Sequence, residues 1–348
     1  TLAEQIFQRA VAQFPDQPAI RLDLAVVMID QQQFAQAKVQ LDNYRRRFGE
    51  SEPFWLTRGY WHDKQGDFFN SLTAYDNALR INPRSQEAWR QKIITVNVLG
   101  MPDKALVLAR EHPGVLHKED ELRLRMDSAA YAVRAAMVQD DNRVLRQERV
   151  HSAISLCDET LHYIEQQFPD KQIAKQTVRL DRLLVWELDN RHQAVLDEYA
   201  ALLQEQAAVR DDTRVAVAQA ALNKEQPLLA VELLVPVTVK QPQETNPRVL
   251  LFYAYLESEQ FELAQATLDA LMRDRPAWRY GQSDKVVGKG WDRVTAESDS
   301  MMLAAWGNNL DAAYTAMHAY VNKAPFNPHL QSAYGDIHYL RGWPRQAQ

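Results

Sequence analysis

The chain has 348 residues, of which 46% are hydrophobic, 9% aromatic and 25% charged, a composition typical of globular proteins rather than disordered or membrane-spanning ones. Its 40 basic and 46 acidic side chains give a formal net charge of −6, which excludes the strongly basic surface expected of a nucleic-acid-binding protein. Only 11 residues are glycine, which favours helices over folds that need many tight turns.

One segment, residues 51–83, carries most signature positions of a tetratricopeptide repeat and resembles that repeat. It reads SEPFWLTRGYWHDKQGDFFNSLTAYDNALRINP. The matching residues are Trp55, Gly59, Gly66, Asp67, Phe68, Tyr75, Ala78, Leu79 and Pro83. Small residues stand where two paired helices approach closely, bulky residues fill the space between them, and proline ends the second helix. The sequence therefore predicts helical hairpins that stack on their neighbours.

The same register extends in both directions. Steps of the ~34-residue period from Ser71 reach Ala37 and Ala3 upstream and Ala105 downstream. The first residues thus read as the second helix of a repeat, so we expect the natural protein to begin earlier. The register weakens after residue 121 and returns at Val195, and then at Ala230, Ala264, Ala313 and Ala347.

These patterns predict an all-α fold, a right-handed superhelical solenoid of tetratricopeptide (TPR)-like hairpins that forms one continuous domain over residues 1–348. We expect regular repeats over 1–117 and longer, divergent hairpins over 118–210, with apolar helical spacing at 122–138 and 143–168. Repeats with an inserted loop are expected over 211–348.

The inserted loop is expected at about 275–295. The step from Ala264 to Ala313 exceeds the ~34-residue period by about 15 residues. The segment holds three glycines, lacks helical periodicity, and carries Trp278, Tyr280 and Trp291 among Arg and Lys residues. Because aromatic and arginine side chains often anchor interfaces, these three aromatic residues are candidates for docking a partner. Alternatively, they cap the adjacent helices.

Sequence motifs give no indication of catalysis. The chain lacks GxSxG, HExxH, CxxC, GxGxxG and Walker sequences, so we expect no enzyme, no cofactor and no metal site. His112 and His117 flank a Pro-Gly turn and are expected to be solvated rather than metal ligands. The single cysteine, Cys157, lies on an apolar stripe and is expected to be a buried, inert thiol.

A repeat solenoid offers a concave groove lined by its first helices, which suits an extended ligand. Aromatic rings stack on sugars or clasp peptides, and carboxylates attract cations. The candidate ligand-binding residues at inward positions are Tyr60, Asp63, Tyr253, Glu257, Asp336 and Tyr339. The alternative for each is a solvated side chain with no ligand.

Three stretches of the last third resemble one family, the outer-membrane exporters of poly-N-acetylglucosamine (PgaA and HmsH). They are residues 250–264, LLFYAYLESEQFELA; the aromatic insertion at 278–291; and residues 340–347, LRGWPRQA. The middle of the chain also matches that family's divergent hairpins. In this family a periplasmic helical-repeat region precedes a carboxy-terminal outer-membrane β-barrel.

The resemblance implies the periplasmic region of a Gram-negative outer-membrane protein, in contact with the membrane only through that barrel. It implies two partners: partly deacetylated poly-N-acetylglucosamine, which is cationic, and the periplasmic deacetylase that produces it (PgaB-like). An alternative class is a TPR adaptor that binds peptide segments, usually by clamping a carboxylate with Lys and Arg. Asp63, Glu257 and Asp336 stand at the inward positions instead.

Overall fold

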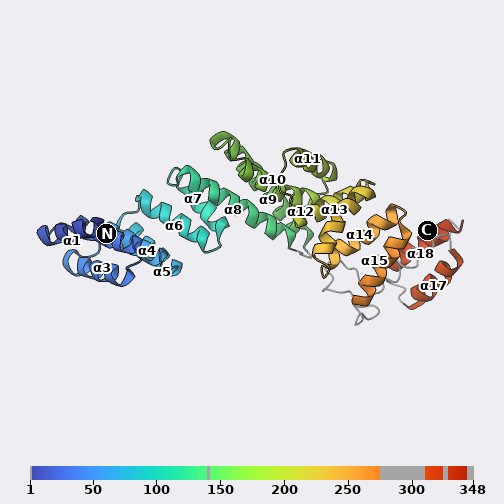
Figure 1. Ribbon diagram of the computed structural model, residues 1–348, viewed down its shortest axis with the longest axis horizontal. Helices are drawn as coiled ribbons and strands as arrows, with labels where there is room; N and C mark the ends of the chain where they lie inside the picture. The colour runs from blue at the N-terminus through green and yellow to red at the C-terminus, as the bar shows by residue number, and fades with distance from the viewer. Residues whose placement is uncertain (1, 139–141, 275–309, 324–327, 343–348) are drawn as a thin grey trace. The chain divides into compact units, whose positions relative to one another are not determined.

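The computed structural model describes residues 2–138, 142–274, 310–323 and 328–342, and all regular structure in these ranges is α-helical (Figure 1). The chain divides into two compact units, Thr1–Asp181 and Arg182–Gln348, so the boundary falls inside α10 (Gln172–Leu188). The predicted all-α fold of TPR-like hairpins is confirmed.

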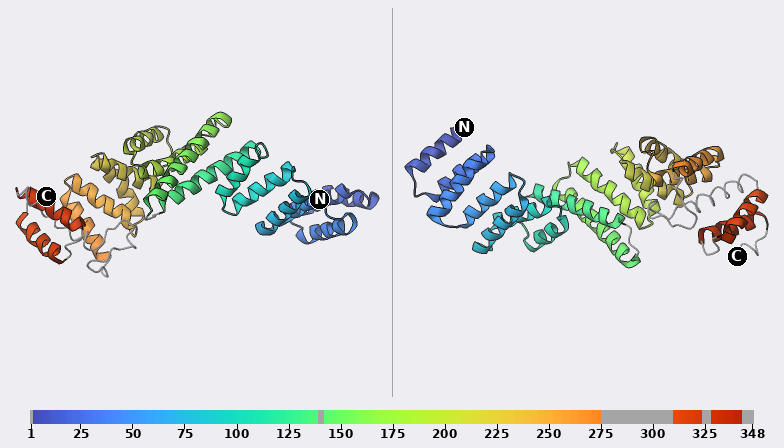
Figure 2. Two further views of the ribbon diagram at one scale, coloured as in Figure 1. Left: turned by 180° about the vertical axis from the view of Figure 1, so that it is seen from behind. Right: turned by 90° about the horizontal axis from the view of Figure 1, so that it is seen from below.

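The first unit stacks helical hairpins side by side (Figure 2). The pairs α2 with α3, α4 with α5, α6 with α7 and α8 with α9 each pack together, as does α1 with α2. The helices are α1 (Leu2–Gln13), α2 (Pro18–Asp30), α3 (Phe34–Phe48), α4 (Glu52–Asp63), α5 (Phe68–Ile81), α6 (Gln86–Val98), α7 (Pro102–Glu111), α8 (Lys118–Met137) and α9 (Arg143–Gln167).

The second unit repeats this arrangement, with α12 packed on α13, α14 on α15, and α17 on α18. Its helices are α11 (His192–Gln204), α12 (Asp211–Asn223), α13 (Pro227–Lys240), α14 (Thr245–Glu257), α15 (Phe261–Asp274), α17 (Leu310–Lys323) and α18 (Pro328–Leu340). The predicted loop at 275–295 and the register position Ala347 lie outside the described residues.

The described residues of the predicted register are buried, with one exception. The residues at these positions, each fully buried, are Ala37, Ser71, Ala105, Val195, Ala230 and Ala264. Ala3 differs, because α1 contacts the core through Phe7 and Val11 and leaves Ala3 exposed. The apolar stripe predicted on α9 is also confirmed, since Cys157 and its stripe neighbours are buried.

Local sequence sets where the helices begin and end. Ser51, Asp67 and Ser85 each cap a helix, with the side-chain oxygen accepting the backbone N–H of the residue three positions later. Proline lies in the first turn of α2, α4, α7 and α13, where its missing N–H costs no hydrogen bond.

The best-matching repeat depends on one close contact between its two helices. Tyr75 on α5 is fully buried and its hydroxyl donates a hydrogen bond of 2.5 Å to Asp63 on α4. A Cβ atom built on Gly59 of α4 would stand 2.7 Å from Cζ of Tyr75 and closer still to Cε1. Glycine at residue 59 therefore makes room for the Tyr75 ring.

The substitution Gly59→Ala should destabilise the protein by about 1–3 kcal/mol, because the added methyl overpacks the Tyr75 ring. Helix propensity alone would predict the opposite sign, a gain of about 1 kcal/mol. Urea denaturation measures the difference. Thr73→Ala, an exposed position on α5, serves as control and should change the free energy of unfolding by less than about 0.5 kcal/mol. A more stable Gly59→Ala variant would contradict this packing.

Several turns between paired helices use a left-handed residue other than glycine. Glu225, between α12 and α13, has φ 55°, and Glu259, between α14 and α15, has φ 61°. The same place in the best-matching repeat is held by Gly66. A side chain in this backbone region costs stability that glycine does not.

Glu225→Gly should raise the free energy of unfolding by roughly 0.5–1 kcal/mol. Glycine removes the cost of the left-handed backbone, and this gain exceeds the cost of its greater flexibility in the unfolded chain. Burial raises the pKa of Glu257, and the negative charge of Glu225 raises it further. The same variant should therefore lower the pKa of Glu257, measured by NMR titration of its side-chain carboxyl carbon.

The matched control is Lys224→Gly. Lys224 has φ −110°, so glycine relieves no left-handed backbone at this position. It should lower stability by about 0.5–1 kcal/mol. Equal effects of the two glycine substitutions would show that the left-handed turn carries no strain.

Candidate ligand-binding surface

The first helices of consecutive hairpins in the first unit form a row of neighbours, α2, α4, α6 and α8, which we call the first-helix row. Polar side chains link its members. The Tyr60 hydroxyl on α4 donates a 2.6 Å hydrogen bond to Asp30 on α2. The Asn97 amide on α6 donates a 2.7 Å hydrogen bond to Asp127 on α8. The row therefore carries carboxylates that are fixed in place by neighbouring repeats.

The two groove candidates of the best-matching repeat both take part in this network. Burial, together with the hydrogen bond to Asp30, raises the pKa of Tyr60 to about 12, so its hydroxyl stays a donor at neutral pH. The ammonium of Lys64 lies 5.1 Å from the centre of the Tyr60 ring. Asp63 is half-buried, and burial raises the pKa of its carboxyl, which accepts from Tyr75. Both side chains thus combine exposed surface with a structural role.

A small pocket opens within the first-helix row between α6 and α8, with a volume of about 40 Å³. We call it the α6–α8 pocket. Its apolar lining consists of Ile93, Ile94, Val98, Leu116 and Leu124, and its polar lining of Asn97, Asp120 and Arg123. Sequence reasoning missed this pocket, although Asp120, Arg123 and Asp127 follow helical spacing on one side of α8.

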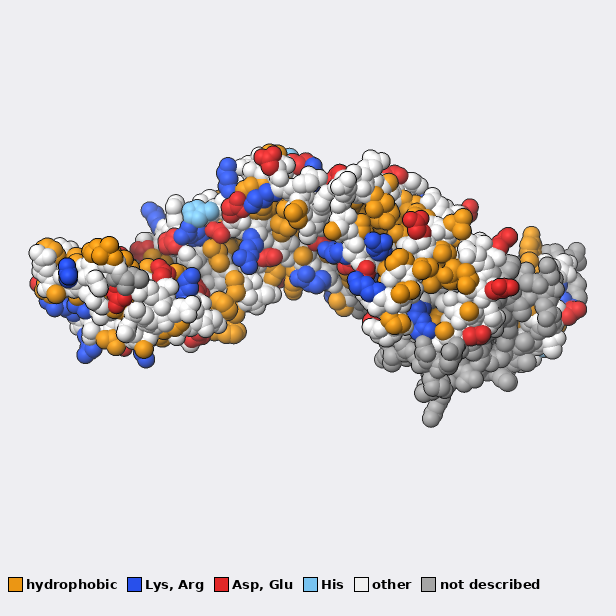
Figure 3. All heavy atoms as spheres, viewed as in Figure 1, with side chains coloured by type: hydrophobic (Ala, Val, Ile, Leu, Met, Phe, Trp, Pro, Cys, Tyr) orange, Lys and Arg blue, Asp and Glu red, His pale blue; other side chains and the backbone are white. Residues whose placement is uncertain are grey.

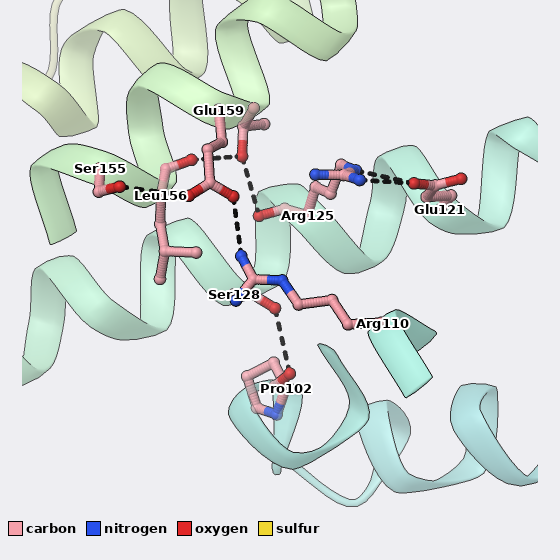
Figure 4. A network of polar contacts seen from close by, with 9 residues as sticks. Pro102, Arg110, Glu121, Arg125, Ser128, Ser155, Leu156 and Glu159 are labelled. Carbon is pink, nitrogen blue, oxygen red and sulfur yellow. Dashed lines mark hydrogen bonds and ion pairs between the residues drawn. The ribbon is translucent and has the colours of Figure 1, made fainter. Parts of the chain in front are cut away.

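A network of polar contacts connects α7, α8 and α9 (Figure 4). The Ser128 hydroxyl on α8 donates to the Pro102 carbonyl of α7 at 3.1 Å. Arg110 of α7 pairs with Glu159 of α9 at 2.8 Å. Arg125 pairs with Glu121 along α8 at 2.6 Å, and its guanidinium carbon lies 4.7 Å from the centre of the Tyr163 ring on α9. Ser128 thus links α8 to α7, Arg125 links α8 to α9, and the Arg110–Glu159 pair joins α7 to α9.

The candidates of the second unit are less connected. Tyr253 is half-buried and packs against the cluster formed by α14 and α15. Glu257 is exposed, and its pKa is raised by partial burial and then by the charge of Glu225. Asp336 and Tyr339 are exposed on α18, with 68% of Tyr339 accessible. Tyr253 and Glu257 lie on α14, whereas Asp336 and Tyr339 lie on α18.

Sequence reasoning also missed an aromatic cluster between α17 and α18. The ring centres of Tyr314 and Tyr334 are 5.7 Å apart, and the His318 ring nitrogen lies 2.7 Å from the Tyr334 hydroxyl. His338 meets both tyrosines edge-on. The signal for this cluster was present in the sequence, because a Tyr-x-x-x-His pattern occurs on each helix and places both side chains on one face.

The two histidines that flank the Pro-Gly turn each contact another side chain. His112 is half-buried and stacks on Trp89 with ring centres 3.6 Å apart, whereas His117 is exposed and contacts Arg90. Across the described ranges, no group of three or more His, Cys, Asp or Glu side chains could hold a metal ion. The loop candidates Trp278, Tyr280 and Trp291 lie outside the described residues.

The surface view shows acidic and basic side chains interspersed, and hydrophobic side chains gathered over α13 to α15 of the second unit (Figure 3). Exposed hydrophobic residues on these helices include Leu228, Val239 and Leu263. Of the helices in the described part of the chain, none has the length and apolar character needed to cross a membrane.

Comparison with known proteins supports the repeat assignment. The tetratricopeptide repeat family matches residues 1–56. Two curated relatives, the poly-β-1,6-N-acetyl-D-glucosamine export proteins of Escherichia coli K12 and of Escherichia coli O157:H7, are each 22% identical over 342 residues. The match covers 80% of this chain and 42% of each relative. The chain thus spans less than half the length of the curated relatives it matches.

Solved structures with similar helical folds include a tetratricopeptide repeat protein from Parabacteroides merdae, with 13% identity, 72% of this chain and 91% of that one covered, and a TM-score of 0.37. Pseudomonas aeruginosa PilF has 12% identity, coverage of 66% and 95%, and a TM-score of 0.41. Yeast Tom70 has 11% identity, coverage of 96% and 74%, and a TM-score of 0.38.

Proposed function

We propose that this chain is a non-catalytic periplasmic scaffold of a Gram-negative exopolysaccharide export system. In this proposal it binds partly deacetylated poly-N-acetylglucosamine and guides the polymer toward an outer-membrane pore. The observation that carries the proposal is the similarity to the E. coli export proteins, which extends over 80% of the chain rather than one repeat. A match confined to residues 1–56 would support only a generic repeat protein.

The charges of the first-helix row support a cationic ligand. Asp30, Asp120 and Asp127 lie on its helices and are exposed or half-buried. Partly deacetylated polymer carries ammonium groups, which these carboxylates attract over distances of about 10 Å at moderate salt. Tyr60 and, in the second unit, Tyr253 and Tyr339 offer rings on which sugar faces can stack.

A protein partner is proposed for the inserted segment instead. Its Arg and Lys residues would repel a cationic polymer and suit an acidic patch on the deacetylase. Trp278, Tyr280 and Trp291 would then serve as anchors of that interface.

Calorimetric titration with partly deacetylated β-1,6-linked oligomers tests polymer binding. Affinity should fall as salt rises, and Asp120→Asn should weaken binding by about two- to five-fold, because one attractive charge beside the oligomer is lost. The matched control is Asp42→Asn, an exposed carboxylate on the second helix α3, which should leave affinity unchanged. Binding of peptides in the absence of any oligomer binding would favour a TPR adaptor and contradict the proposal.

The double variant Trp278→Ala/Trp291→Ala tests the docking of the deacetylase. Binding of the purified deacetylase should fall at least ten-fold, since buried tryptophan anchors are commonly worth about 2 kcal/mol or more. Oligomer affinity should stay unchanged. If the variant instead loses several kcal/mol of stability while deacetylase binding by the folded fraction is unaltered, these tryptophans cap the neighbouring helices.

A further inference from the structure

We propose that the α6–α8 pocket is a subsite for the acetamido group of one N-acetylglucosamine unit. This inference rests on the proposed function and makes it more specific. The first-helix row would then bind an acetylated unit through the pocket. Its carboxylates would attract the ammonium group of a deacetylated unit beside it. The best ligand is accordingly a mixed oligomer, and neither homopolymer should match it.

The size of the pocket selects a small group. One buried water needs roughly 10–15 Å³ in the same measure, so about 40 Å³ accommodates about three or four small atoms. An acetamido group has four non-hydrogen atoms, whereas a whole hexose ring is far too large. The sugar ring must therefore remain outside, with only its substituent inserted.

The floor of the pocket suits a methyl group rather than an ammonium. Two of its lining residues, Ile93 and Leu124, are almost fully buried, at 1% and 2% exposure, and Ile94 and Val98 add further aliphatic surface. An ammonium pressed against these aliphatic side chains would lose its hydration and find no hydrogen-bond acceptor on them. The acetyl methyl instead removes apolar surface from water.

The polar lining is complementary to the two ends of an amide. The Asn97 amide nitrogen is occupied by Asp127, which leaves its oxygen as the acceptor at the pocket. That oxygen is buried and accepts no hydrogen bond from the part of the chain that the structure describes. An acetamido N–H would supply the missing donor.

The opposite end of the amide needs a donor, and Arg123 provides one. Its side chain is 77% exposed and lines the same pocket, with Nε 4.0 Å from the Asp127 carboxylate, so its guanidinium keeps donors for an acetyl carbonyl. Asp120 and Asp127 lie beside the pocket and attract the ammonium of an adjacent glucosamine unit.

The test compares three β-1,6-linked oligomers of equal length: fully acetylated, fully deacetylated, and mixed. The mixed oligomer should bind roughly five- to ten-fold more tightly than the fully deacetylated one, because it adds one inserted methyl and one amide hydrogen-bond pair. Saturation-transfer NMR should show the acetyl methyl of the mixed oligomer in closest contact with the protein.

Two tryptophan variants distinguish binding in the α6–α8 pocket from binding elsewhere on the surface. Val98→Trp, at a rim position 45% exposed, should fill the pocket and reduce the affinity for the mixed oligomer to that of the deacetylated one. Val39→Trp, at a position 54% exposed on α3, should leave both affinities unchanged. Asn97→Leu, which removes the acceptor, should reproduce the loss seen with Val98→Trp.

Equal affinity for mixed and deacetylated oligomers, unaffected by Val98→Trp, would overturn the acetamido subsite while leaving polymer binding in place. Absence of binding by all three oligomers would overturn the proposed function and the subsite with it. If a short peptide with small aliphatic side chains binds instead, and Val98→Trp blocks that binding, the pocket belongs to a peptide ligand and the inference is wrong.

Discussion

The two helices of the best-matching hairpin, α4 and α5, approach so closely at Gly59 that no larger residue fits there without a shift of the Tyr75 ring. Ala37, Ser71 and Ala105 recur at constant spacing along the chain, and all three residues are fully buried. Because the spacing is constant, successive hairpins have similar structures and stack in the same orientation. Their first helices therefore lie in a row.

In the first-helix row, the same polar side chains that join neighbouring helices are also those available to contact a ligand. Tyr60 binds Asp30 and Tyr75 binds Asp63, so part of the acidic character of this surface is used to join helices. Asn97 shows the other outcome, because its nitrogen joins α6 to α8 while its oxygen accepts nothing from the described residues. Where structural bonds leave such an atom unused, a ligand can add a hydrogen bond without breaking one.

The sequence was sufficient to predict the helix pairs, because their packing follows from short-range periodicity. Ser71 and Ala264 were assigned to helix crossings from spacing alone, and both are fully buried. The α6–α8 pocket was beyond such reasoning, since it depends on how far α8 is rotated about its axis. The contacts around α8 join distant segments that no repeat signature encodes: Ser128 donates to the Pro102 carbonyl of α7, and the Arg110–Glu159 pair links α7 to α9.

Cys157 gives the long α8–α9 hairpin a built-in reporter. It is the only thiol in the chain and is completely inaccessible on α9. A thiol reagent can reach it only when α9 separates from its neighbours, so the labelling rate in native buffer measures the free energy of that local opening. Comparison with the global free energy of unfolding then reveals whether this hairpin opens independently or only together with the rest of the first unit.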